Sequence, residues 1–266
     1  MRKNLKKKKN GFTLVEVLIA IIVGGLVMLA VYMAMVMSQR TSAGVGRKVI
    51  TQQDTRAVLG IMASEIAMAS FNPLVQPTTW TGASIVNLNN CGIPVVAANP
   101  LNKGILFADA SNIYIAMDLS ADGVIGCACA NPADCSNDVP CAGQNEFILY
   151  SYNSATRAIT RRVSCSLAIS ILGGTALGSN VINQDAGIPV FQYFDSNGQP
   201  LPLPINIPAV RRIKITIVAE TAEIDLNTRD RKRMIYSTDI IARNHAAFSP
   251  NTGAGGAGGG GVVVGP

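Results

Sequence analysis

A long apolar run behind a block of lysines constrains this chain more than any other feature of its sequence. Between Phe12 and Met37, Glu16 is the only charged side chain. A helix over residues 12–37 would be about 39 Å long, and the hydrocarbon core of a bilayer is about 30 Å thick. A charged side chain inside such a span costs roughly 2.5–3.5 kcal/mol unless it finds a partner. The sequence therefore predicts a membrane-spanning helix with one costly carboxylate near its start.

The residues in front of this run indicate how the helix is oriented. Six basic and no acidic side chains precede Gly11: Arg2, Lys3, Lys6, Lys7, Lys8 and Lys9. Such an excess of positive charge keeps a flanking segment on the cytoplasmic side. A secretory signal peptide has a shorter apolar core of about 7–15 residues and a small-residue cleavage site after it. We therefore expect residues 1–11 to be cytoplasmic and residues 12–37 to cross the inner membrane once.

The boundary between the two segments carries a short motif. Positions 11–16 read Gly-Phe-Thr-Leu-Val-Glu, which resembles the processing site of type IV prepilins and of type II secretion pseudopilins. The resemblance implies that a prepilin peptidase cleaves between Gly11 and Phe12, that Phe12 is N-methylated, and that Glu16 serves in assembly. Chemistry agrees with this, because a glycine lets an enzyme approach the backbone closely. Cleavage also creates a positive amine at Phe12, a natural counter-charge for Glu16.

A helical pattern continues beyond the apolar run. One stripe of apolar residues recurs at helical spacing: Val58, Ile61 or Met62, Ile66 and Ala69. We expect a single helix over residues 12–70, in which residues 12–37 are apolar all round and residues 38–70 are amphipathic. Pro73 is the expected end of the helix. The stripe would pack against a globular head.

Short runs rich in Ile, Val, Tyr and Phe follow Pro77, separated by Asn, Gly, Pro and Asp. This is typical of antiparallel strands. We expect strands at residues 104–108, 112–118, 146–152, 158–164, 189–195, 210–220 and 232–243, with hairpin connections at residues 152–157 and 195–198. A helix packed on such a sheet predicts an α+β head over residues 71–250, exported to the periplasm.

The order of the C-terminal segments narrows the resemblance to a subtype of pilin. Residues 191–198, a spacer, the Arg-Ile-Lys-Ile-Thr-Ile strand at 212–217 and a final strand resemble PilW-type minor pilins. J-type minor pseudopilins of type II secretion are a similar alternative. Either resemblance implies the type IV pilin fold, a long N-terminal helix packed on an antiparallel sheet.

The cysteines bear on compartment and cross-links. All six lie beyond the apolar run: Cys91, Cys127, Cys129, Cys135, Cys141 and Cys165. An even count on the exported side indicates up to three disulfides, whose pairing stays open. We expect Cys135 or Cys141 to close the local loop of the insert at residues 126–145, and Cys91 or Cys165 to tie it to the head. A zinc site is the alternative, but the spacing lacks the repeated short knuckle that structural zinc prefers.

A possible cation loop precedes this insert. Side-chain oxygens alternate from Asp118 in the pattern Asp-x-Ser-x-Asp-Gly, as in the first half of an EF-hand loop. Position 12 of that loop is Cys129 in place of the usual glutamate, and the insert could return Glu146, Asp134 or Asp138 instead. The calcium candidates are Asp118, Ser120, Asp122, the Val124 carbonyl and Glu146. The alternative is an ordinary turn without metal.

The charge balance and the remaining motifs exclude other classes. The net charge of +6 disappears once the six leader cations are removed, because 16 Lys and Arg then face 16 Asp and Glu. The basic clusters at residues 211–214 and 229–233 have acidic neighbours, so no nucleic-acid partner is required. The one histidine, His245, is expected on the surface, and neither a Gly-x-Ser-x-Gly elbow nor a phosphate loop occurs. We expect no enzyme, and no cofactor other than calcium.

These features predict a minor type IV pilin. We expect it to be held in the bacterial inner membrane, processed, and then built with other pilins into a periplasmic or extracellular filament that it primes or caps. A minor pseudopilin is the first alternative, and an unprocessed, membrane-anchored binding domain is the second. The glycine-rich residues 251–266 cannot build a core and are expected to be disordered.

Overall fold

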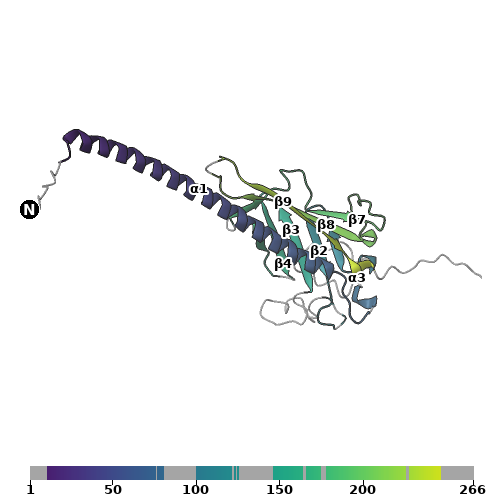
Figure 1. Cartoon of the computed structure of the whole chain (residues 1–266). Helices are drawn as coiled ribbons and strands as arrows, with labels where there is room; N and C mark the ends of the chain where they lie inside the picture. The colour runs from purple at the N-terminus through teal and green to yellow at the C-terminus, as the bar shows by residue number, and fades with distance from the viewer. Residues whose placement is uncertain are drawn as a thin grey trace, which may run out of the picture.

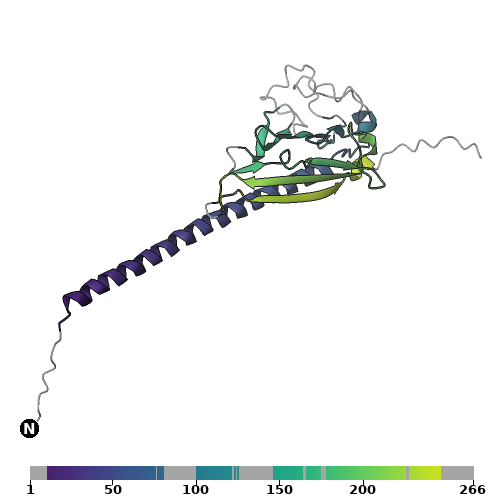
Figure 2. The same cartoon turned by 90° about the horizontal axis from the view of Figure 1, so that it is seen from above.

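A single helix, α1 (Leu14–Ala67), dominates the shape of the molecule. In the computed structural model its first half projects alone from the head, and its second half lies against strands (Figures 1 and 2). Neither Gly24-Gly25 nor Gly44 and Gly46 interrupt it. The structure describes residues 11–75, 77–80, 100–121, 123, 125, 146–163, 166–174, 178–225 and 228–246.

The head contains two antiparallel sheets. The strands are β1 (Ile105–Ala108), β2 (Asn112–Ala116), β3 (Phe147–Asn153), β4 (Ala158–Val163), β5 (Ile169–Gly173), β6 (Ser179–Val181), β7 (Phe191–Phe194), β8 (Arg212–Thr221) and β9 (Arg233–Ile241). The first sheet has the sequential order β1-β2-β3-β4-β5. In the second, β9 pairs along most of β8, so β6 and β7 share the other edge of β8 at its two ends. The predicted α+β class, a long N-terminal helix on antiparallel strands, is confirmed.

Three details differ from the sequence predictions. The helix ends at Ala67 because residues 68–70 form a turn, in which Ser70 has a φ of 66° and its N–H bonds the Ala116 carbonyl at 2.9 Å. Strands β5 and β6 were not predicted. β6 has only three residues, too few for a pattern, and the first two residues of β5 are exposed, so β5 lacks a regular buried alternation.

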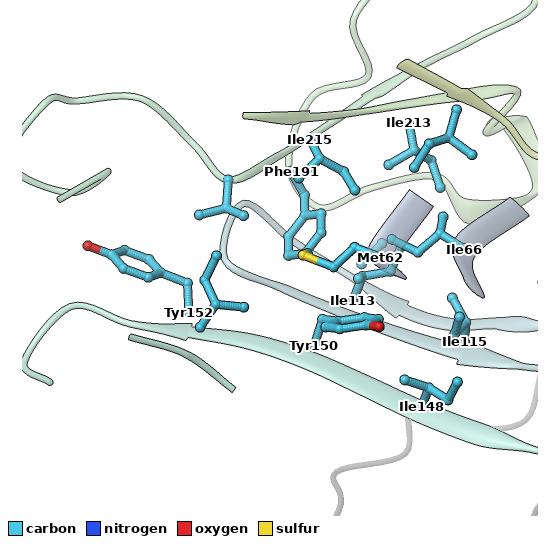
Figure 3. Packing of buried hydrophobic residues seen from close by; sticks show 14 of the residues in the cluster. Met62, Ile66, Ile113, Ile115, Ile148, Tyr150, Tyr152, Phe191, Ile213 and Ile215 are labelled. Carbon is cyan, nitrogen blue, oxygen red and sulfur yellow. The ribbon is translucent and has the colours of Figure 1, made fainter. Parts of the chain in front are cut away.

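The second half of α1 supplies one stripe to the core. Its buried residues are Thr51, Thr55, Val58, Leu59, Met62 and Ile66. The sequence offered Ile61 or Met62 as a member of the apolar stripe. Ile61 is 48% exposed and Met62 is fully buried, so Met62 is the one that packs in the core. Figure 3 shows Met62 and Ile66 between side chains of the two sheets, with Tyr150 on one side and Ile213 on the other. The helix is therefore the shared core element that joins the sheets.

A charged group locks the helix to the first sheet. Glu65 of α1 accepts two hydrogen bonds from Arg161 of β4, at 3.0 Å from Nε and 2.6 Å from Nη2. The Tyr150 hydroxyl donates to the same carboxylate. Burial, and then the bond to Glu65, raise the pKa of Tyr150 well above its usual range. This forked geometry fixes the rotation of α1 about its own axis.

An asparagine fills the gap between β6 and β7. Asn183 is buried, and its side-chain amide donates to the Thr216 carbonyl at 2.8 Å while its oxygen accepts from the Val218 N–H at 2.8 Å. These are the backbone groups of β8 that a continuous strand would otherwise satisfy. The side chain thus completes the edge of the sheet and prevents two buried polar groups from being left unpaired.

Candidate processing and assembly site

The start of α1 is the first functional candidate. Gly11 and Phe12 precede the helix and are exposed, and Thr13 is its N-cap with φ −77° and ψ 149°. A Cβ built on Gly11 would have no neighbour within 4 Å. Packing within this chain therefore does not require a glycine at position 11. A requirement for one would come from an enzyme that grips the backbone there.

Glu16 is tied to the helix start by a capping box. Its Oε2 accepts hydrogen bonds from the Thr13 N–H at 2.9 Å and the Thr13 hydroxyl at 3.0 Å, and Thr13 Oγ1 accepts from the Glu16 N–H at 3.3 Å. From the sequence, this carboxylate is expected to be a lone charge. The Thr-x-x-Glu spacing was the signal that could have predicted the box. These bonds lower the cost of the charge locally and leave it at the exposed N-terminal end of the helix.

The apolar half of α1 is uncovered. Within the described residues, α1 is the one helix long and apolar enough to cross a membrane, and none of its most apolar window is buried inside the molecule. Phe12, Leu14, Tyr32 and Met37 are each more than 60% exposed. An apolar surface of this length needs lipid or other protein to cover it.

The predicted calcium residues are brought together in part. Asp118 and Glu146 are fully buried, and Glu146 Oε1 accepts the N–H groups of Leu119 at 3.0 Å and Ser120 at 2.9 Å. Ser120 is exposed. Asp122 and Val124 lie outside the described residues. The Glu146 side chain thus reaches back to the loop that Asp118 begins.

His245 is the clearest correction. The residue is expected on the surface from the sequence, but its exposed fraction is only 2%. Its Nε2 lies 2.9 Å from the Ile207 carbonyl and therefore carries the proton, so Nδ1 accepts from the Ser70 hydroxyl at 3.1 Å. Ser70 Oγ in turn accepts the Gly104 N–H at 3.0 Å. Contacts 175 residues apart in sequence decide this burial, and no local pattern reveals them.

The hydrogen-bonded pair of Ser70 and His245 has a structural role. Both residues are buried, and His245 belongs to the short helix α3 (Arg243–Ala246), which closes over the end of α1. Lys103 Nζ donates to the His245 carbonyl at 2.9 Å. The pair therefore ties the C-terminal part of the head to the helix, and its burial leaves a substrate no access to the serine.

Acidification should weaken the fold through His245. Burial, followed by the positive charges of Lys103 and Arg211, lowers its pKa from 6.5 to about 4. The unfolded chain then binds more protons than the folded one between pH 6.5 and 4, so stability falls as the pH drops through that window. The loss approaches about 3 kcal/mol. Denaturant unfolding of the wild type and His245→Gln should show a flatter pH dependence in the variant. Equal slopes would contradict the assignment.

The basic clusters are paired with acids. Arg212 forms an ion pair with Asp239 at 2.6 Å. Glu220 forms ion pairs with Arg231 at 3.2 Å and with Arg233 at 2.9 Å. The acidic neighbours noted in the sequence thus include direct partners of these arginines. The predicted leader at residues 1–10, the tail at residues 251–266 and all six cysteines (Cys91, Cys127, Cys129, Cys135, Cys141 and Cys165) lie outside the described residues, so the disulfide candidates remain predictions.

Comparisons with known proteins point to the same N-terminal feature. Residues 6–32 match the family model of the prokaryotic N-terminal methylation motif. No curated protein matches the chain. Among solved structures, a type IV-like pilin from Thermus thermophilus is similar at 12% sequence identity and a TM-score of 0.38, over 73% of this chain and 98% of that chain. The family match covers the N-terminal motif and the first part of α1, and the observed architecture is a long helix packed on antiparallel strands.

Proposed function

We propose that the chain is a minor subunit of a type IV pilus-like filament, stored in the inner membrane and released from it by assembly. One observation carries the proposal: the residues that match the methylation motif lead into an exposed apolar helix half, charged only at Glu16, that no described part of the head covers. A soluble protein would not expose such a surface. In the membrane, lipid covers it; in a filament, the equivalent helices of other subunits do.

The proposed mechanism begins with cleavage. A prepilin peptidase cuts between Gly11 and Phe12, and the new Phe12 amine is methylated. Because Thr13 holds Glu16 at the start of the helix, the carboxylate is presented where an amine of a neighbouring subunit can reach it. That pairing removes the cost of a buried lone charge and sets the axial position of the incoming subunit.

The head fits a role at a filament end. PilW-type minor pilins are the subtype that the order of the last segments resembles, and the sequence carries a cysteine-rich insert at residues 126–145. We infer that few copies are used, to prime or cap the filament. The pseudopilin alternative shares the same processing and the same helix exchange between lipid and filament core.

Blocking cleavage tests the proposal directly. In cells that contain a prepilin peptidase, we expect Gly11→Val to leave the leader attached, because a branched side chain keeps the enzyme from the backbone. Intact-mass spectrometry should show the wild type beginning at a methylated Phe12 and the variant retaining residues 1–11. The expected change is a nearly complete loss of processing.

Gly46→Val is the matched control. Gly46 is also a glycine without a neighbour within 4 Å of a built Cβ, but it lies in the middle of α1. This variant should be processed like the wild type. A wild-type protein that functions with Met1 and the lysines still attached would instead favour an unprocessed, membrane-anchored binding domain.

A further inference from the structure

Two buried carboxyl groups meet the connection that follows β2: Asp118 begins it, and the Glu146 side chain reaches the backbone of the next two residues, Leu119 and Ser120. Asp118 and Glu146 have no exposed surface. The backbone also joins the two positions, since the Met117 N–H donates to the Glu146 carbonyl at 3.0 Å. Carboxylates are rarely buried without a compensating positive charge, because removing them from water costs several kcal/mol each.

Only one of the two carboxylate oxygens of Asp118 has a hydrogen-bond partner. Its Oδ2 accepts the Gly123 N–H at 3.0 Å, but its Oδ1 is buried and has no hydrogen-bond partner. No ion pair to Asp118 occurs among the described residues. A buried carboxylate oxygen without a partner needs an explanation, and a bound cation is one that also supplies the balancing charge.

The surroundings hold this oxygen in a fixed place. Ile125, which follows Asp118 in the chain, and Phe147, which directly follows Glu146, are buried in a second apolar cluster with Trp80, Leu106 and Ala116. Glu146 Oε1 accepts the N–H groups of Leu119 and Ser120. The described residues next to both carboxylates are therefore held in place before any ligand arrives.

We propose that this loop binds one calcium ion, with Asp118 Oδ1 and the Glu146 carboxylate as its charged ligands. A hard divalent cation fits two carboxylates and loop oxygens, and Ca²⁺ tolerates the irregular coordination of such a loop better than Mg²⁺ does. The two proposed side-chain ligands are carboxylates, which are hard oxygen donors that suit calcium better than a soft transition metal. The ion would join the end of β2 to the start of β3.

Calcium titration of the full-length chain in detergent tests the proposal. After treatment with a chelator, isothermal titration with calcium chloride should show one ion bound per chain. Thermal unfolding followed by circular dichroism should shift upward by about 5–10 °C when calcium is about 100-fold above its Kd. Absence of binding up to about 10 mM calcium, above the range of weak extracellular sites, would overturn the proposal.

Matched variants locate the ion. Asp118→Asn and Glu146→Gln keep shape and an acceptor oxygen but remove one charge each, and each should weaken calcium binding at least tenfold. Asp195→Asn is the control, because Asp195 also accepts backbone N–H groups in a turn, at 2.8 Å from Asn197 and Gln199, but is not fully buried. Wild-type affinity in both Asp118→Asn and Glu146→Gln would disprove the assigned site. If either variant fails to fold, the other and the wild-type stoichiometry still decide.

Discussion

Replacement of Glu16 by alanine is expected to yield a processed, membrane-inserted chain that does not enter filaments. Removing the carboxylate makes the helix more apolar, so insertion should be retained or improved. What is lost is the partner for the Phe12 amine of a neighbouring subunit. Cell fractionation should find the variant in the membrane, and its level in sheared filaments should fall to background. Normal incorporation, with the variant as the sole copy, would refute the mechanism.

A glutamine at the same position separates charge from capping. The structure gives Glu16 a second role, because it completes a capping box with Thr13. Glutamine also serves in such boxes, so Glu16→Gln preserves the helix start and removes only the charge. If the charge sets assembly, Glu16→Gln fails as alanine does. Filaments that contain the glutamine variant would show that helix capping alone is required.

Gly104→Ala is expected to destabilise the head by at least about 3 kcal/mol, or about 6–12 °C in Tm. A Cβ on Gly104 would lie 2.2 Å from the Ser70 N and 2.3 Å from the Ala116 O. Both are backbone atoms in hydrogen bonds, so neither can move without breaking the junction between α1 and the first sheet. Thermal and denaturant unfolding of the full-length chain measure the loss.

Gly60→Ala is the control for this substitution. Gly60 is exposed in the middle of α1, and a Cβ there would meet nothing within 4 Å. Alanine should stabilise the helix by about 0.5–1 kcal/mol. The two variants make the same chemical change and should move stability in opposite directions. A loss of similar size in both would contradict the assignment of a tight junction at Gly104.

Local patterns were sufficient for the helix and most strands. The apolar run of residues 12–37 and the stripe through Met62 and Ile66 follow from helical spacing, and α1 contains both. All strands except β5 and β6 were predicted within a few residues of their ends. β6 was missed because three residues carry too short a pattern, and its position depends on pairing with β8.

The candidate site residues also fall into two groups: some follow from a local motif, and others depend on contacts between distant segments. Gly11, Phe12 and Glu16 belong to one hexapeptide, so a sequence motif contains everything needed to predict them. Asp118 was predicted from the spacing of its own loop, but Glu146 follows an insert of 20 residues, and only the pairing of β2 with β3 brings it back. The orphaned Oδ1 of Asp118 is visible only in three dimensions.

The sequence by itself determined the membrane-length helix, the motif at its start and the α+β class, because each depends on residues that are neighbours along the chain. Tertiary structure alone decided the burial of His245, the hydrogen bonds between the Asn183 side chain and β8, and the closeness of Gly104 to Ser70. Those contacts join segments far apart in sequence, where packing and hydrogen-bond satisfaction, rather than local periodicity, select the conformation.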